Sequence, residues 1–380
     1  MIAATTPLTQ LDDLLNRIGL KLQLSETAYE QASDRYTTMS KWLGASGSRL
    51  AIYRPDIYPQ GSLRIGTTVK PRGRDEFDLD LVCQFQAKPE TFSNPIALLD
   101  MVEARLRENE TYRPMVERKN RCIRVTYANQ FHLDILPACP SPTAGLYGEH
   151  AVLVPDCDLD DWKPSNPKGF PLWYEDCARA AATEFKRAHE PLPEQQSYNE
   201  LSTLNRVVQL GKRQRDIAFE KTPELAPISI VLTTLAAQTY GGQSSVSEAM
   251  QIVLNGIVAM LPSVAEGRLK VLNPTNVAED LSERWDDNPE AYLAFVKWVH
   301  SFRAKWTELI SAQGIQNVKA VLESMFGERV AKEVVMEHIR EFELPRQSGA
   351  LAVERGTGRI VPTSVASSIP IQRNTFYGKD

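Results

Sequence analysis

Three aspartates lie in two stretches that have the alternating pattern of β-strands. In residues 77–85 large apolar side chains alternate with Asp78 and Asp80, and a period of two is typical of a half-buried strand. Side chains two residues apart on a strand point to the same face, about 6.5–7 Å apart along the chain. Residues 131–136 repeat the alternation and place Asp134 on the face opposite the apolar residues. If the two strands are neighbours, the three carboxylates surround one point.

Carboxylates gathered in this way predict a site for divalent cations. Like charges this close repel each other unless a cation lies between them, and hard oxygen ligands suit Mg²⁺ or Mn²⁺. Two cations about 3.5–4 Å apart support in-line phosphoryl transfer. We therefore expect Asp78, Asp80 and Asp134 to be catalytic and to hold two Mg²⁺ or Mn²⁺ ions. An Asp-x-Asp pair alone has a plainer interpretation, the solvated end of a strand.

A short turn before the first acidic strand has the residues needed to bind a phosphate. Gly61 allows the backbone to approach a phosphate closely, and Ser62 adds a hydroxyl and an amide donor. We expect Gln60, Gly61 and Ser62 to bind nucleotide. Four basic residues follow, and they are expected either beside a triphosphate or in a solvated loop: Arg64, Lys70, Arg72 and Arg74. The order of Gly-Ser, Asp-x-Asp and a later lone Asp makes the combination specific.

The remaining chain predicts helices on both sides of the strand region. Apolar residues recur at helical spacing in residues 8–43 and again after residue 201. Residues 120–128 predict a strand that leads through a turn at Asn129-Gln130 to the Asp134 strand. Seven prolines at positions 137–171 indicate a long irregular stretch, either a functional loop or a crossing between lobes. Residues 346–380 show no sustained period and predict a flexible tail.

Composition and charge limit the class of protein. The 380 residues allow two or more lobes, and 42% apolar and 24% charged residues are typical of a soluble globular protein. A net charge of −5 argues against stable nucleic-acid binding over the whole surface. We expect a cytoplasmic protein without a membrane span, because no signal peptide or stretch of about 20 apolar residues is evident. The five cysteines show no C-x-x-C spacing and are expected to be reduced thiols.

Residues 60–67, residues 75–82 and Asp134 together resemble the active site of the polymerase-beta-type nucleotidyltransferases. Within that superfamily they are similar to the bacterial cGAS/DncV-like nucleotidyltransferases, the CD-NTase family, and the likeness extends over about residues 25–344. The resemblance implies an α+β fold: a polymerase-beta-type core, made of a mixed sheet with helices, plus a helical C-terminal lobe. We expect an N-terminal helix and the catalytic core in residues 1–195. The lobe that completes the nucleotide cleft is expected in residues 196–345, and the tail in residues 346–380.

The resemblance also implies two residues that hold the donor triphosphate. Family members use a lysine on one helix and a serine near the start of the next, and Lys212 and Ser229 match in type and order. Pro227 suits the start of a helix over residues 228–240, where free amides and the helix dipole favour an anion. A solvated lysine and a helix-start serine are the alternative interpretation.

The function implied by the resemblance is condensation of nucleoside triphosphates into a cyclic di- or trinucleotide second messenger, with release of pyrophosphate, in anti-phage signalling of the CBASS type. Asp134 would complete the metal that faces the acceptor hydroxyl and receive its proton. Two alternatives are a linear nucleotidyltransferase, which extends an RNA end or makes linear oligonucleotides, and a non-catalytic nucleotide sensor or scaffold. The partners implied are ribonucleoside triphosphates, an operon-encoded regulator, and a ubiquitin-like conjugation enzyme that acts at residues 374–380.

Overall fold

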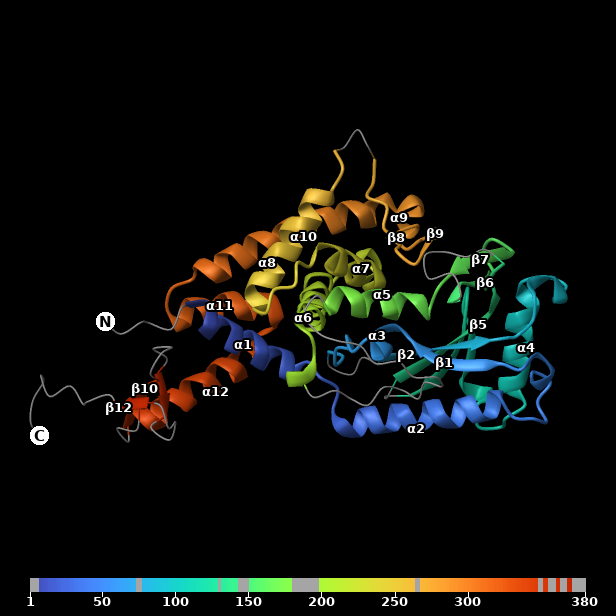
Figure 1. The fold of residues 1–380 in the computed structure, drawn as a ribbon, viewed down its shortest axis with the longest axis horizontal. Helices are drawn as coiled ribbons and strands as arrows, with labels where there is room; N and C mark the ends of the chain where they lie inside the picture. Colours follow the sequence, from blue (N-terminus) through green and yellow to red (C-terminus); the bar gives the residue numbers. More distant parts are fainter. Residues whose placement is uncertain are drawn as a thin grey trace, which may run out of the picture.

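Both acidic strands belong to one sheet of mixed direction (Figure 1). The computed structural model describes residues 7–72, 77–128, 131–142, 150–179, 198–263, 267–347, 351–354, 360–362 and 368–370. Within these ranges the sheet has the order β1-β2-β5-β4-β3, and β5 also pairs with β6, which pairs with β7. β2 and β5 are parallel, whereas the other pairs are antiparallel. The bounds are β1 Asp56–Gln60, β2 Phe77–Gln84, β3 Val116–Arg118, β4 Ile123–Tyr127, β5 Phe131–Pro140, β6 Val152–Asp156 and β7 Asp161–Ser165.

One face of this sheet is packed against helices, and the other face carries the aspartates. The packed face presents four fully buried residues: Leu79, Leu81, Leu133 and Ile135. They share a hydrophobic core with α2 (Glu26–Leu43) and α4 (Ile96–Arg107). Arg105 of α4 holds the two helices together, because its guanidinium lies 3.7 Å from the centre of the Trp42 ring and donates two hydrogen bonds to the Trp42 carbonyl. The predicted alternation in the two acidic stretches is thus confirmed by the burial of alternate residues.

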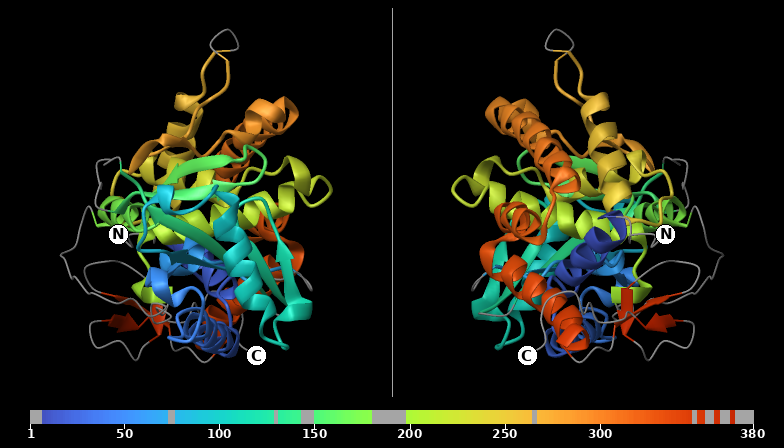
Figure 2. Two further views of the ribbon diagram at one scale, coloured as in Figure 1. Left: turned by 90° about the vertical axis from the view of Figure 1, so that its right-hand side faces the viewer. Right: turned by 90° about the vertical axis from the view of Figure 1, so that its left-hand side faces the viewer.

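A second core joins the helices of the other lobe (Figure 2). In Figure 2, α8 and α10 lie at one extreme of the molecule and α2 lies at the opposite one. α1 packs against α6, α8 and α12, and its Leu15 and Ile18 are fully buried there. No helix in the described part of the chain combines the length and the apolar character of a membrane span. The helix bounds are α1 Pro7–Lys21, α5 Gly169–Ala178, α6 Thr203–Ala218, α7 Ser229–Thr239, α8 Val246–Met260, α9 Arg284–Asp287, α10 Pro289–Ser311, α11 Ile315–Phe326 and α12 Glu328–Gln347.

The structure differs from the sequence expectations in three places. α1 lies in the core of the helical lobe, whereas the sequence predicts it in the unit 1–195. The proline-rich stretch is not irregular throughout, since it contains the end of β5 and the hairpin of β6 and β7. Pro164 is tolerated because β7 pairs on one side only, and an edge strand can lack an amide donor.

The third difference concerns the end of the chain, which we expect from sequence to be a flexible tail from residue 346. Instead, α12 continues to Gln347, and β10 (Leu351–Glu354), β11 (Ile360–Pro362) and β12 (Ser368–Pro370) form a three-stranded sheet. Three other sequence expectations concern Arg74, the turn at Asn129-Gln130 and residues 374–380, and these lie outside the described residues.

A buried asparagine ties the two lobes together where the sheet leads into α5. The Asn166 side chain is completely buried. Its Oδ1 accepts a hydrogen bond from the Gly169 amide at 2.9 Å, and its Nδ2 donates to the Thr275 carbonyl at 3.1 Å. Thr275 lies between β8 (Leu272–Asn273) and β9 (Asn276–Asp280), and β9 packs against β7. The start of α5 at Gly169 is therefore held by the Asn166 side chain.

We expect Asn166→Ala to lower the free energy of unfolding by about 2–3 kcal/mol, because a buried donor and a buried acceptor lose their partner. Asn94 offers a matched control. Its Oδ1 accepts from the Ala97 amide three residues later, in the same local geometry, but Asn94 is exposed. Asn94→Ala should cost about 1 kcal/mol or less. Urea unfolding of both variants, followed by circular dichroism, measures the difference, and equal losses would contradict the inter-lobe role of Asn166.

Candidate active site

A row of polar residues crosses four strands on the face turned toward the helical lobe. Gln60 at the end of β1 is paired with Asp80 of β2, and Asp80 is paired with Asp134 of β5. Asp134 is in turn paired with Arg124 of β4. Residues paired across a sheet point to the same face, and Asp78 lies two residues from Asp80 on that face. The structure therefore brings together the three carboxylates that the sequence predicts to meet.

The Asp80 carboxylate has no direct cationic partner among the described residues. Among the described residues no hydrogen bond or ion pair to its carboxylate is found. Burial first, and then the negative charges of Asp134 and Asp78, raise the pKa of Asp80 to about 7. The positive charges of Arg124 and Lys212 act in the opposite direction but do not cancel the rise. An added cation next to Asp80 would therefore stabilise its ionised form.

Arg124 supplies positive charge to the other two carboxylates. Its Nε donates to Asp134 Oδ1 at 2.7 Å, and its Nη2 donates to Asp134 Oδ2 at 2.7 Å. The same Nη2 lies 3.3 Å from Asp78 Oδ1. The hydrogen bond to Asp134 raises the pKa of Arg124 above its ordinary value. Sequence reasoning did not single out Arg124, although its alternation with Ile123 and Val125 is a signal that it lies on the acidic face.

The glycine of the Gly-Ser turn is required by close approach as well as by backbone conformation. Gly61 begins α3 (Gly61–Arg64) with φ +69°, a region that side chains other than glycine rarely adopt. A Cβ atom at this position would lie 2.2 Å from Asp80 Oδ2. Ser62 is held beside it, because the Thr68 hydroxyl donates to Ser62 Oγ at 3.1 Å and the Thr67 amide donates to the Ser62 carbonyl at 2.9 Å.

One face of α6 binds the backbone of the loop that follows the turn. Asn205 Nδ2 donates to the Ile65 carbonyl at 2.7 Å, and Gln209 Nε2 donates to the Thr68 carbonyl at 3.0 Å. Lys212 Nζ donates to the Thr67 carbonyl at 3.0 Å and to the Thr67 hydroxyl at 3.1 Å. These three α6 residues are spaced by four and three positions, so they share one side of the helix. The helical lobe thereby fixes the loop on which Ser62 depends.

Lys212 is a buried lysine near the carboxylates. Its side chain is 5% exposed, and burial lowers the pKa of Lys212 to about 7, helped by the positive charge of Arg215. The negative charges of Asp216 and Asp80 act in the opposite direction. In this structure the Lys212 ammonium group donates hydrogen bonds to Thr67. The lysine expected to bind a triphosphate therefore lies close to Asp80, but its ammonium group is bound by another residue of the chain.

Ser229 lies at the first position of α7, as the sequence predicts, and its hydroxyl is hydrogen-bonded to Arg215. Arg215 Nη1 donates to Ser229 Oγ at 2.9 Å and to the Pro227 carbonyl at 3.1 Å. Arg215 therefore connects Ser229 to the helix that carries Lys212.

Two of the arginines that the sequence predicts either beside a triphosphate or in a solvated loop form ion pairs within the protein. Arg64 forms an ion pair with Glu175 at 2.8 Å. Arg72 binds Glu220 at 2.9 Å and also donates to the Asp216 carbonyl. For Lys70, the described contact of its carbonyl is with Arg213. The sequence could not separate these roles, because a charged loop has no periodicity.

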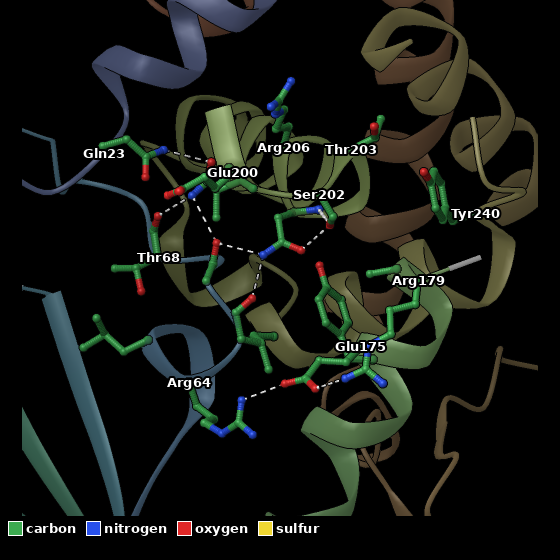
Figure 3. A pocket seen from close by; sticks show the side chains of 18 of the residues that line it. Gln23, Arg64, Thr68, Glu175, Arg179, Glu200, Ser202, Thr203, Arg206 and Tyr240 are labelled. Carbon is green, nitrogen blue, oxygen red and sulfur yellow. Dashed lines mark hydrogen bonds and ion pairs between the residues drawn. The ribbon is translucent and has the colours of Figure 1, made fainter. Parts of the chain in front are cut away.

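A cavity of about 750 Å³ lies on the other side of α3 (Figure 3). Figure 3 shows the ion pairs of Glu175 with Arg64 and Arg179 along one wall, with Gln23 and Thr68 on another. Asn205 and Gln209 also line it. None of the three catalytic candidates is among its described lining residues, so this cavity is separate from the acidic row.

The carboxylates and their surroundings fit a divalent metal. The donors are hard carboxylate oxygens of the kind that Mg²⁺ and Mn²⁺ prefer, and Asp80 lacks a cationic partner. Within the described residues no group of three His, Cys, Asp or Glu side chains is already closed around a metal-sized point. In this structure both oxygens of Asp134 accept hydrogen bonds from the Arg124 guanidinium.

Comparison with known proteins gives close relatives over the whole chain. The family model SMODS, the Second Messenger Oligonucleotide or Dinucleotide Synthetase domain, matches residues 9–177. The c-di-GMP synthase of Roseivirga ehrenbergii is 35% identical over 100% of both chains. The cyclic dinucleotide synthase CdnG of Bradyrhizobium diazoefficiens is 28% identical over 94% of this chain and 90% of its own.

Solved structures show the same fold. The structure of Bradyrhizobium diazoefficiens CdnG in complex with GTP has a TM-score of 0.69 and 25% identity, and the match covers 87% of this chain and 99% of that one. The Vibrio cholerae DncV cyclic AMP-GMP synthase has a TM-score of 0.54 at 16% identity, with 86% of each chain covered, which supports the fold alone. The predicted α+β fold and family are confirmed. The chain belongs to the CD-NTase family of polymerase-beta-type nucleotidyltransferases.

Proposed function

We propose that this nucleotidyltransferase condenses two molecules of GTP into cyclic di-GMP and releases two molecules of pyrophosphate. The observation that carries the proposal is the row of Asp80 and Asp134 on parallel neighbouring strands, with Gly61 packed against the Asp80 carboxylate. The choice of GTP is supported by the 35% identical c-di-GMP synthase and by the CdnG structure with GTP.

The reaction is the same in both condensation steps. A ribose hydroxyl oxygen forms a bond to the α-phosphorus of the donor, and the bond from that phosphorus to the bridging oxygen breaks. Pyrophosphate leaves, and we propose that a carboxylate oxygen of Asp134 receives the hydroxyl proton. The second step joins the two ends of the linear intermediate, which closes the ring.

The residues of this chain would divide the work as follows. Gly61 lets the Asp80 carboxylate lie directly against the turn, since it has no Cβ, and Ser62 offers a hydroxyl that Thr68 already orients. Lys212 is proposed to bind the triphosphate tail from its position near Asp80, and Ser229 to bind it at the start of α7. In-line displacement depends mostly on such positioning and on neutralisation of charge.

Asp78, Asp80 and Asp134 are the residues that would hold the divalent metals, which we propose to be two Mg²⁺ or Mn²⁺ ions. When bound, these ions supply Lewis acidity at the attacking hydroxyl and neutralise charge on the triphosphate. Asp80 is suited to this role because burial and its two acidic neighbours disfavour its ionised form without a cation.

The other functions considered from the sequence are less well supported. A linear nucleotidyltransferase would use the same carboxylates, but the relatives that match the whole chain are named as cyclic dinucleotide synthases. A non-catalytic sensor does not need three carboxylates on one face of the sheet, and here all three are present. A role in anti-phage signalling, an operon-encoded regulator, conjugation at residues 374–380 and a cytoplasmic location stay proposals that follow from the family resemblance.

Incubation with each ribonucleoside triphosphate and Mg²⁺, followed by mass spectrometry, tests the substrate and product. GTP alone should give a product with the mass of cyclic di-GMP that resists alkaline phosphatase, and excess chelator should abolish it. A phosphatase-sensitive product would favour the linear alternative. A product that requires ATP, CTP or UTP would contradict the choice of GTP while leaving the reaction class intact.

Asp80→Asn should lower turnover by about a thousandfold, because a metal-centred charge stabilisation of several kcal/mol is lost. The variant should fold, since the amide is neutral and burial already opposes the charged form of Asp80. Asp34→Asn, on the exposed side of α2, removes the same charge from the same lobe and should leave turnover unchanged. Pyrophosphate release measures both, and an active Asp80→Asn enzyme would contradict the site.

Gly61→Ala should reduce kcat/KM by about a hundredfold or more, because a Cβ would collide with Asp80 Oδ2 and the positive φ would be strained. Gly211→Ala is the matched control. Gly211 lies inside α6, where a Cβ meets nothing within 4 Å, so this change should preserve activity and add about 1 kcal/mol of stability. Steady-state kinetics and thermal unfolding of the pair measure the contrast. Equal activity in both variants would show that Asp80 can move away without loss.

A further inference from the structure

Arg124 lies between two acidic residues in a single row across the sheet. On one side it is paired with Asp134 of β5, and on the other side it is paired with Glu117 of β3. Paired residues share a face, so Glu117 continues the row that begins at Gln60. Arg124 can thus be reached by two carboxylates from neighbouring strands, and only one of them belongs to the catalytic group.

In the present arrangement Arg124 is committed to the catalytic side. Nε and Nη2 both bind Asp134, one to each carboxylate oxygen, at 2.7 Å. Nη2 also reaches Asp78 at 3.3 Å. A two-pronged pair of this kind is stronger than a single charged hydrogen bond because the planar guanidinium matches the carboxylate. These contacts engage both oxygens of Asp134, so a metal bound by Asp134 would compete with Arg124 for them.

Glu117 lies on the β3 side of Arg124 and does not belong to the catalytic group. Its carboxylate is largely exposed and is bound by Lys119 at 2.5 Å. The hydrogen bond from Lys119 lowers the pKa of Glu117, and the positive charges of Arg124 and His132 contribute to the same shift. Glu117 is therefore ionised at neutral pH and close enough to be affected by Arg124. If the Arg124 guanidinium were released from Asp134, the Glu117 carboxylate in the same row could bind it.

We propose that Arg124 is an internal counter-ion that competes with divalent metal for Asp134 and Asp78, and that its guanidinium transfers to Glu117 when metal binds. This inference rests on the proposed function, because it takes the three aspartates as the metal ligands. It explains how Asp78, Asp80 and Asp134 can be held together on one face of the sheet, and why, among the described residues, they are not already closed around a metal-sized point. Arg124 is a positioning residue in this account, since it acts through Asp134.

The test is Mn²⁺ binding to the nucleotide-free protein, followed by the electron paramagnetic resonance signal of free Mn²⁺. Arg124→Gln should bind Mn²⁺ about tenfold more tightly than the wild type, because the competing guanidinium is gone. Arg124→Lys keeps the charge but loses the two-pronged contact, so it should also bind more tightly than the wild type. The control is Arg118→Gln on β3. Arg118 pairs with Asp100 and Glu103 and, next to Glu117 along the strand, faces the opposite side, so its Mn²⁺ affinity should stay within twofold.

Glu117→Gln tests the second half of the proposal. It should weaken Mn²⁺ binding severalfold, because the displaced guanidinium loses its alternative partner. In an Arg124→Gln background the same change should have little effect, since there is no guanidinium left to receive. A simple loss of negative charge would instead weaken binding equally in both backgrounds, and that result would contradict the transfer to Glu117.

Thermal unfolding in chelator supplies a readout that does not require catalysis. Arg124→Gln should unfold at a lower temperature than the wild type in chelator, because the carboxylates lose their counter-ion, and Mn²⁺ should raise its unfolding temperature by more. If Arg124→Gln binds Mn²⁺ no more tightly, while Asp80→Asn still abolishes binding, the counter-ion role is wrong and the metal site stands. If Asp80→Asn leaves Mn²⁺ binding unchanged, the metal site fails and the proposed function fails with it.

Discussion

The parallel pairing of β2 with β5 imposes the constraint on which the rest of the site depends. It places Asp80 directly beside Asp134 on one face, so carboxylates that would separate in solution are held together by the sheet. The opposite faces of the same strands hold the strands in this register. They carry Leu79, Leu81, Leu133 and Ile135, which are fully buried and cannot change face without exposing the core. The repulsion therefore cannot be relieved by the backbone. It must be met by charge, from Arg124 and Lys212 in this structure.

The nucleotide turn is built from both lobes, although it is continuous in sequence with the sheet. Gly61 and Ser62 follow β1, but the loop after them is held by Asn205, Gln209 and Lys212 of α6. These bonds are made to carbonyl groups, so they constrain the path of the backbone whatever the loop side chains are. Asn166 adds a second connection between the lobes farther along the sheet. The path of the loop after the turn is thus fixed by the way the lobes are joined.

Period-two alternation was enough to predict the acidic strands, because it reports burial, and burial decides which face a side chain takes. It could not give the register of the neighbouring hairpin. A two-residue turn at Asn129-Gln130 would pair residue 128 with Phe131 and set Arg124 opposite Ile135. The structure pairs Tyr127 with Phe131, and this one-residue difference brings Arg124 opposite Asp134. The contacts of Lys212 and Arg215 were equally hidden, since polar bonds to distant backbone follow no local period.

The row across the sheet also has a direction, and the proposed reaction uses it. At the β1 end lie the features suited to a triphosphate, Gly61 and Ser62, with Lys212 close to Asp80. Farther along the row lie Asp134 and Arg124. On the proposed roles the donor occupies the β1 end and the attacking hydroxyl the position beside Asp134. Ring closure needs the same bond to form again with the two nucleotides exchanged, because the former acceptor now carries the triphosphate. Since both places belong to paired positions of one rigid sheet, the protein offers the same geometry to each step, and it is the linear intermediate that must turn around.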